Sequence, residues 1–207
     1  MNMLDLLPAI KRITNTPKIK DLRSITYLST YPSILSIGAT PKPIDLDRFH
    51  QLAMMAYGWM PRVIRIDQAH IAVALPAAVK AQSATVETIS PELVKAIARC
   101  LHSVVGASKV LHFIKPTVFP IWDSNIERFR ANRKPSNVHM NNTAHYLNYL
   151  QDVHAIKHDP RFPTFYKQYN AALGNRLRAL GIRLYEVSEV RAIEAAAFDL
   201  ALADSGA

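Results

Sequence analysis

The stretch from Gly106 to Asp123 constrains the fold more than any other part of this sequence. It reads Gly-Ala-Ser-Lys-Val-Leu-His-Phe-Ile-Lys-Pro-Thr-Val-Phe-Pro-Ile-Trp-Asp. This order predicts a helix stop at Gly106, a short apolar helix that starts at Lys109, a rigid turn bounded by two prolines, and a second helix that starts at Asp123. Two helix starts joined by so short a turn can lie antiparallel and face one cleft.

The two ionisable residues of this stretch are candidate catalytic groups. The amine of Lys109, placed in the positive field of a helix N-terminus and partly screened from water, is biased toward its neutral, nucleophilic form. The carboxyl group of Asp123 at a helix start is biased toward its ionised form. The alternative interpretations are that Asp123 is only a helix cap and that Lys109 is a solvated residue or a phosphate contact.

Helix signals dominate the chain from about Pro43 onward, so we predict a mainly α fold. Caps or starts are predicted at Ser90-Pro91, Asn142-Thr143, Phe162-Pro163 and Ser188. The β-branched and aromatic residues between Ser24 and Gly38 predict a short extended segment, and Val63 to Ile66 predict another. We expect one globular domain over residues 1–207, with a less regular part at 1–42 and a helical core at 43–207.

The charge balance points to a polyanionic partner. The 207 residues include 25 Lys and Arg against 16 Asp and Glu, for a net charge of +9. Five of the acids are Glu186, Glu189, Glu194, Asp199 and Asp204, so the chain before them is more basic still. We therefore predict DNA or RNA binding.

Composition also limits location and cofactors. No apolar run is long enough to span a bilayer and no export signal opens the chain, so we expect no membrane partner. A cytoplasmic location is predicted, with nucleoid association if the protein binds DNA. The single cysteine, Cys100, excludes an internal disulfide and any multi-cysteine metal site, and we predict no metal and no cofactor.

The run from Gly106 to Asp123 resembles the core of the helix-hairpin-helix DNA glycosylase superfamily, in particular its oxoguanine glycosylase-like branch. Lys109 falls on the catalytic lysine of that family, Pro116 and Pro120 on its loop prolines, and Asp123 on its aspartate. The resemblance implies a helix-hairpin-helix fold and a DNA glycosylase that excises a damaged or modified base. It also allows abasic-site lyase activity by β-elimination through a lysine Schiff base.

The resemblance also implies roles for residues near the two catalytic candidates. His112 and Phe113 lie about one turn after Lys109 and are candidates for a base pocket, together with Phe119 and Trp122. All four have an alternative interpretation as buried core residues. Four further cations follow Asp123 and are candidates for DNA-backbone contacts: Arg128, Arg130, Arg133 and Lys134.

Other functions stay open at this point. A non-enzymatic nucleic-acid-binding module on a glycosylase-like scaffold would carry the same motif. The spacing of Arg133 and His139 resembles the motif of HEPN-type ribonucleases, although Pro135 interrupts that stretch. His154 and His158 lie four residues apart but lack an evident third ligand, so we interpret the pair as incidental. The base that is excised, and whether the role is repair or defence, are also open.

Overall fold

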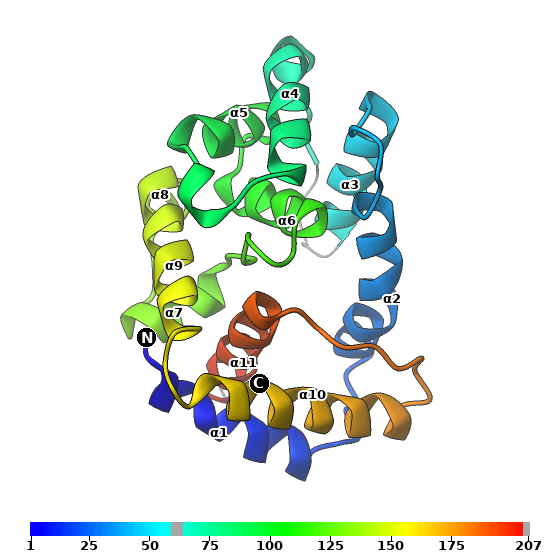
Figure 1. Cartoon of the computed structure of the whole chain (residues 1–207), viewed down its shortest axis with the longest axis vertical. Helices are drawn as coiled ribbons and strands as arrows, with labels where there is room; N and C mark the ends of the chain where they lie inside the picture. Colours follow the sequence, from blue (N-terminus) through cyan, green and yellow to red (C-terminus); the bar gives the residue numbers. More distant parts are fainter. Residues whose placement is uncertain (59–63, 205–207) are drawn as a thin grey trace. The chain divides into compact units, whose positions relative to one another are not determined.

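The computed structural model of the chain describes residues 1–58 and 64–204 (Figure 1). Over these residues the protein contains eleven α-helices, two short 3-10 turns and no strand, which confirms the mainly α prediction. Within the same residues no helix combines the length and the hydrophobicity that crossing a membrane requires.

The described residues divide into two compact units, each built from segments that are distant in sequence. Unit 1 comprises Met1–Pro32, Ser124–Lys134 and the described part of Asp152–Ala207. Unit 2 comprises Ser33–Asp123, apart from 59–63, and Pro135–Gln151. The sequence analysis predicted one domain. No linker or change of composition marks these units, because the chain passes between them inside helices α2 and α9 and around α7.

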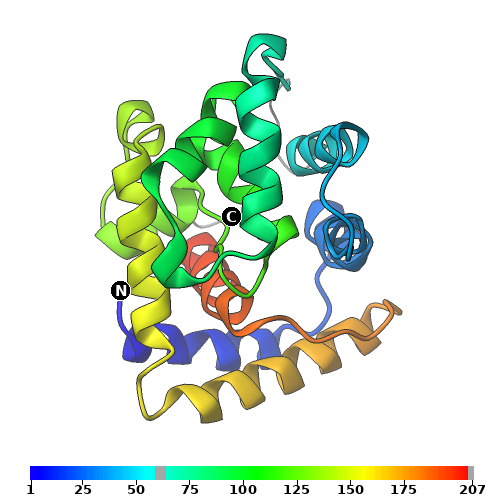
Figure 2. The same cartoon turned by 45° about the horizontal axis from the view of Figure 1, so that its top comes forward.

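Unit 1 contains α1 and α10, which run side by side in both views (Figures 1 and 2). The apolar residues Met3, Leu6, Ala9 and Ile13 recur at helical spacing and are buried on one face of α1, so hydrophobic burial holds this helix in place. Helix α11 packs on α1 and on α7. The helices wholly within this unit are α1 (Met3–Asn15), α7 (Ser124–Ala131), α10 (Phe162–Ala179) and α11 (Glu189–Asp204).

Unit 2 is centred on α6, which packs against α3, α4 and α5. Ten of its eleven residues are buried, which its apolar sequence explains. The helices wholly within this unit are α3 (Leu46–Gly58), α4 (Ile71–Gln82), α5 (Pro91–Leu101), α6 (Val104–Ile114) and α8 (Asn137–Met140), with 3-10 turns at Gln68–His70 and Val86–Thr88. Residues of α2 (Leu22–Gly38) and α9 (Thr143–Ile156) belong to both units.

The predicted extended segment between Ser24 and Gly38 is wrong, because these residues form α2. Asp21 immediately precedes this helix, and its carboxylate accepts hydrogen bonds from the backbone N–H groups of Arg23 and Ser24 at 3.2 and 3.0 Å. A hydrogen bond from the Ser24 hydroxyl, followed by these backbone bonds, lowers the pKa of Asp21. The cap outweighs the weak strand preference of the β-branched and aromatic residues that follow.

Two further predictions concern segments expected to lack helices. The part over 1–42, predicted to be less regular, holds both α1 and α2. In the second predicted extended segment, Ile64 to Ile66 have no regular structure, and Val63 lies outside the described residues.

The four helix starts predicted at Ser90-Pro91, Asn142-Thr143, Phe162-Pro163 and Ser188 are confirmed. The backbone N–H of Leu93 donates to Ser90 Oγ at 3.2 Å, that of Ala144 to Asn142 Oδ1 at 2.8 Å, and that of Arg191 to Ser188 Oγ at 3.2 Å. Helix α10 begins at Phe162 as predicted. Each short polar side chain satisfies an amide that has no partner within its own helix, and this is why these starts can be read from sequence.

Candidate functional site

The helix that carries Lys109 begins earlier than the sequence analysis predicted. Ser103 is its N-cap and accepts a hydrogen bond from the backbone N–H of Gly106 at 2.9 Å, so Gly106 lies inside α6 rather than ending α5. The left-handed residue that ends α5 is His102, with φ of 50°. Lys109 therefore lies in the second turn of α6, and the argument from the field of a helix N-terminus does not apply to it.

Helices α5 and α6 are joined by only two residues, His102 and Ser103. The first amides of α6 are satisfied by side chains of unit 2, because Val104 N–H donates to Asn141 Oδ1 at 3.2 Å and Gly106 N–H donates to Ser103 Oγ. These two donors are therefore engaged within the protein.

The segment from Lys115 to Asp123, called the signature loop below, connects α6 to α7 without regular structure. Three consecutive backbone carbonyl groups of this loop accept hydrogen bonds from buried side chains. His112 Nδ1 lies 2.8 Å from Phe119 O, and because a carbonyl only accepts, this nitrogen carries the proton. The hydroxyl groups of Tyr146 and Tyr149 on α9 donate to Pro120 O at 3.1 Å and Ile121 O at 3.2 Å.

The next peptide group of the signature loop is held by Ser108. The backbone N–H of Trp122 donates to Ser108 Oγ at 3.1 Å, while the same hydroxyl donates to Val105 O at 2.8 Å. Four successive residues of the loop are thus fixed by side chains from α6 and α9. We call these four side chains, Ser108, His112, Tyr146 and Tyr149, the loop clamp.

The clamp brings the neighbours of the two catalytic candidates together. Ser108 directly precedes Lys109, and Trp122 directly precedes Asp123, so the hydrogen bond between Ser108 and Trp122 joins the two chain segments at this point. Lys109 is buried with 6% of its surface exposed. Asp123 is half-buried and immediately precedes α7, which confirms the predicted helix start.

The predicted base-pocket residues lie in the core of unit 2. His112, Phe113, Phe119 and Trp122 each have no exposed surface. The Trp122 ring lies 5.9 Å from that of Tyr146 and 6.1 Å from that of His139, measured between centroids. Stacking on an extruded base would require these rings to become exposed, so their assignment to a base pocket stays a prediction.

The predicted DNA-backbone residues belong to unit 1 and fall into two pairs. Arg128 donates to Ala201 O at 2.8 Å, and Arg130 binds Glu127 through Nε and Nη2 at 2.8 and 2.9 Å. Arg130 also donates to Asp152 at 2.7 Å, and the hydrogen bonds that it donates to Glu127 raise its pKa. The other pair, Arg133 and Lys134, is exposed. The first pair thus has a structural role, and phosphate binding stays a prediction for all four.

Three clamp residues were not singled out by sequence reasoning. These residues are Ser108, which directly precedes Lys109, and Tyr146 and Tyr149 on α9. Tyr146 and Tyr149 lie three residues apart, which places both on one face of α9. A tyrosine at a buried position needs a partner for its hydroxyl group. That rule marks such residues as candidates but does not identify which carbonyl group they hold.

The two histidine hypotheses also have structural outcomes. His154 is buried and His158 is exposed. Throughout residues 1–58 and 64–204 no group of three or more His, Cys, Asp or Glu side chains is placed to bind a metal ion. In the ribonuclease alternative, Arg133 belongs to unit 1 and His139 to unit 2. His139 stacks on His145, with centroids 3.9 Å apart and an interplanar angle of 13°.

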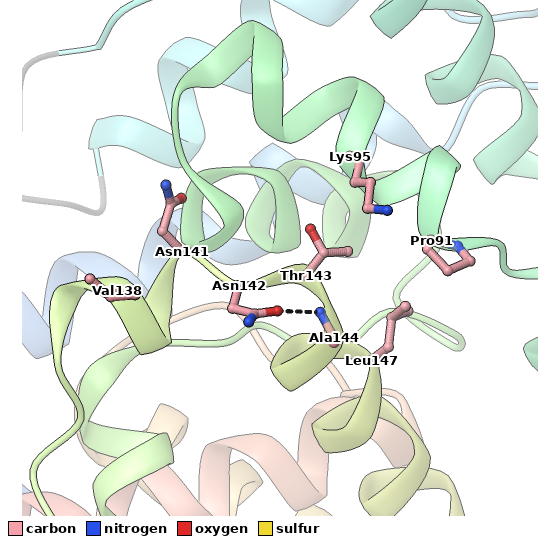
Figure 3. Close-up of a pocket in the computed structure, with 8 residues that line it drawn as sticks. All are labelled: Pro91, Lys95, Val138, Asn141, Asn142, Thr143, Ala144 and Leu147. Carbon is pink, nitrogen blue, oxygen red and sulfur yellow. Dashed lines mark hydrogen bonds between the residues drawn. The ribbon is translucent and has the colours of Figure 1, made fainter.

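A pocket of about 500 Å³ opens on unit 2 away from the signature loop (Figure 3). Helix α5 contributes Pro91 and Lys95, and the start of α9 contributes Thr143 and Leu147. Neither Lys109 nor any other residue predicted to act in catalysis, in the base pocket or in DNA-backbone contact lines it. The remaining lining residues are Val138, Asn141, Asn142 and Ala144.

A scan against protein-family models and searches of curated proteins and of solved structures returned no match for this chain. The resemblance to helix-hairpin-helix glycosylases therefore depends on the residues from Gly106 to Asp123.

Proposed function

We propose that this protein is a DNA-binding base-excision enzyme, a DNA glycosylase with abasic-site lyase activity through Lys109. The observation that carries the proposal is the hydrogen bond between Ser108 and Trp122, because it joins the segments that bear a buried lysine and a half-buried aspartate. An amine and a carboxylate held on adjacent segments are the pair that a lysine-dependent glycosylase uses.

The proposed reaction begins with Lys109. Its neutral amine attacks C1′ of the target nucleotide, so that the Nζ–C1′ bond forms as the glycosidic bond breaks. The base leaves with the bonding electrons and takes up a proton from water. Sugar ring opening then gives a Schiff base, and removal of a C2′ proton expels the 3′ phosphate by β-elimination. Burial favours the neutral state of amines in general, because desolvation penalises their charge.

Asp123 has two roles in this proposal. As a carboxylate it accepts the proton that Lys109 loses on attack, and it stabilises the positive charge that develops on the sugar. Exposed cations such as Arg133 and Lys134 hold the DNA backbone. Since two of the first amides of α6 already have side-chain partners, side-chain cations carry more of the phosphate binding than the hairpin backbone does.

Borohydride trapping on duplexes with an abasic site or a damaged base tests the proposal. Wild-type protein should form a covalent protein–DNA adduct, and Lys109→Met, which keeps much of the side-chain volume, should form none. Lys95→Met is the matched control, because it removes an exposed lysine of the same unit and should trap like wild type. Circular dichroism would verify that both variants are folded.

The alternatives give different results in the same experiment. Salt-sensitive DNA binding without any adduct would overturn the lyase activity and favour a binding module. Cleavage of RNA that is abolished in His139→Ala would favour the ribonuclease.

A further inference from the structure

The loop clamp bonds backbone groups of a buried segment that lies outside the helices. The signature loop contains Pro116 and Pro120, which have no backbone N–H, and Phe119 to Trp122 are buried. Buried carbonyl groups require hydrogen bonds, and here they obtain them from side chains instead of from a helix or sheet.

The clamp residues are arranged so that two helices act on one loop. Ser108 and His112 are four residues apart on α6, and Tyr146 and Tyr149 are three residues apart on α9, so each pair lies on one helix face. The four contacts fall on four consecutive residues, and the last of these is covalently joined to Asp123. A shift of the loop along its own direction would break all four bonds together.

We infer that Ser108, Tyr146 and Tyr149 are positioning residues that fix the Asp123 carboxylate relative to the Lys109 amine, with His112 supporting the same loop. This inference rests on the proposed lysine chemistry. Proton transfer and charge stabilisation require an alignment that a misplacement of 1 Å can disturb by about a hundredfold in rate. The three hydroxyl groups hold the loop that carries Asp123 through hydrogen bonds alone. They therefore position its carboxylate without placing another charged side chain near Lys109.

Single-turnover borohydride trapping on an abasic duplex, at saturating protein, tests the inference. Ser108→Ala and Tyr149→Phe should slow adduct formation about tenfold or more, with DNA affinity within twofold of wild type. Ser108→Thr keeps the hydroxyl group and should restore most of the rate. The matched control is Tyr166→Phe, which removes a hydroxyl group bonded to Val187 O at 2.8 Å in unit 1, and it should trap at the wild-type rate.

A double-variant cycle separates positioning from a merely structural role. If Ser108 acts through Asp123, then Ser108→Ala should have little further effect in an Asp123→Asn background, whereas independent losses would multiply. Hydrogen exchange of the Trp122 amide should also accelerate in Ser108→Ala, because its partner is gone.

Two failures are distinguishable. No adduct from wild-type protein would overturn the proposed function and the positioning role with it. Wild-type trapping combined with unchanged rates in the clamp variants, or with multiplicative losses in the cycle, would overturn the positioning role and leave the lyase assignment intact.

Discussion

The two units bury polar side chains in different ways. In unit 1 two buried arginine side chains form ion pairs, Arg130 with Glu127 and Arg176 with Asp199. In unit 2 two buried tyrosine side chains donate to backbone carbonyl groups, Tyr149 to that of Ile121 and Tyr57 to that of Leu101. An ion pair joins two side chains and leaves the backbone path free. A hydrogen bond from a side chain to a carbonyl group fixes the path of that backbone segment.

This difference has an energetic consequence. Removing one partner of a buried ion pair leaves an uncompensated charge, whereas removing a hydroxyl group costs one hydrogen bond of modest net value. Variants of the buried ion pairs in unit 1 should therefore lose more stability than variants of the loop clamp, which should lose more activity than stability. The comparison is testable because the same chain offers a control for each kind of interaction. The ion pair of Arg161 and Asp159 is the control for the buried ion pairs, and the hydrogen bond from Tyr166 to Val187 O is the control for the loop clamp.

The largest expected loss follows from Glu127→Gln. Glu127 has no exposed surface and binds Arg130 through both carboxylate oxygens. Replacing it by a neutral amide should lower the free energy of unfolding by about 3–5 kcal/mol, because the cation of Arg130 loses a buried partner. Urea denaturation followed by circular dichroism would measure it. A loss below about 1 kcal/mol would mean that Asp152 alone satisfies Arg130.

The next prediction concerns backbone contact in unit 2. A Cβ atom on Gly38, the last residue of α2, would lie 1.9 Å from the backbone oxygen of Phe113 in α6. Because a backbone group cannot rotate away as a side chain can, Gly38→Ala should cost about 3 kcal/mol, at the upper end of overpacking effects. Gly58→Ala is the matched control, since among the residues that the structure describes none lies within 4 Å of its Cβ position, and it should not destabilise the protein.

A smaller loss is expected for Ser108→Ala. The substitution removes the acceptor of a buried backbone N–H at Trp122, which should cost about 1–3 kcal/mol. Thermal unfolding monitored by circular dichroism would measure the change. Tyr166→Phe leaves a carbonyl group outside the loop clamp without its partner and provides the comparison. If Ser108→Ala matched Glu127→Gln in stability, the contrast between the two units would fail.

Much of the fold could be predicted from sequence because caps are local. Ser90, Asn142 and Ser188 each accept a hydrogen bond from a backbone N–H two or three residues later. A stretch of three or four residues is therefore enough to identify the helix start. The end of α5 could not be predicted in this way. His102 takes the left-handed conformation there, and only glycine and asparagine signal that conformation reliably in a sequence.

The candidate site was predictable only in part. Lys109 and Asp123 stand out by residue type and order, but the hydroxyl groups that hold the signature loop come partly from α9, more than twenty residues further along the chain. No local pattern specifies which carbonyl group a tyrosine will reach. The division into two units was hidden for the same reason, since it arises from contacts between distant segments.

The smallest effect on stability is expected from an exposed ion pair of unit 1. Hydrogen bonds from the Arg161 side chain, then from its backbone N–H, lower the pKa of Asp159 to about 2. Because the folded pKa lies below the ordinary aspartate value of 3.8, any stabilisation is present above that value and is lost as the pH falls through about 2.

Arg161→Gln should therefore raise the Asp159 pKa toward its ordinary value, as read by NMR titration of its carboxyl carbon, while the urea midpoint at neutral pH stays unchanged. Water and salt screen an exposed pair, so a large pKa shift here does not imply a large contribution to stability. Glu127→Gln differs because its partner is removed from water. A clear drop of the urea midpoint in Arg161→Gln would contradict this prediction. It would show that an ion pair of unit 1 stabilises the fold even when it is not buried.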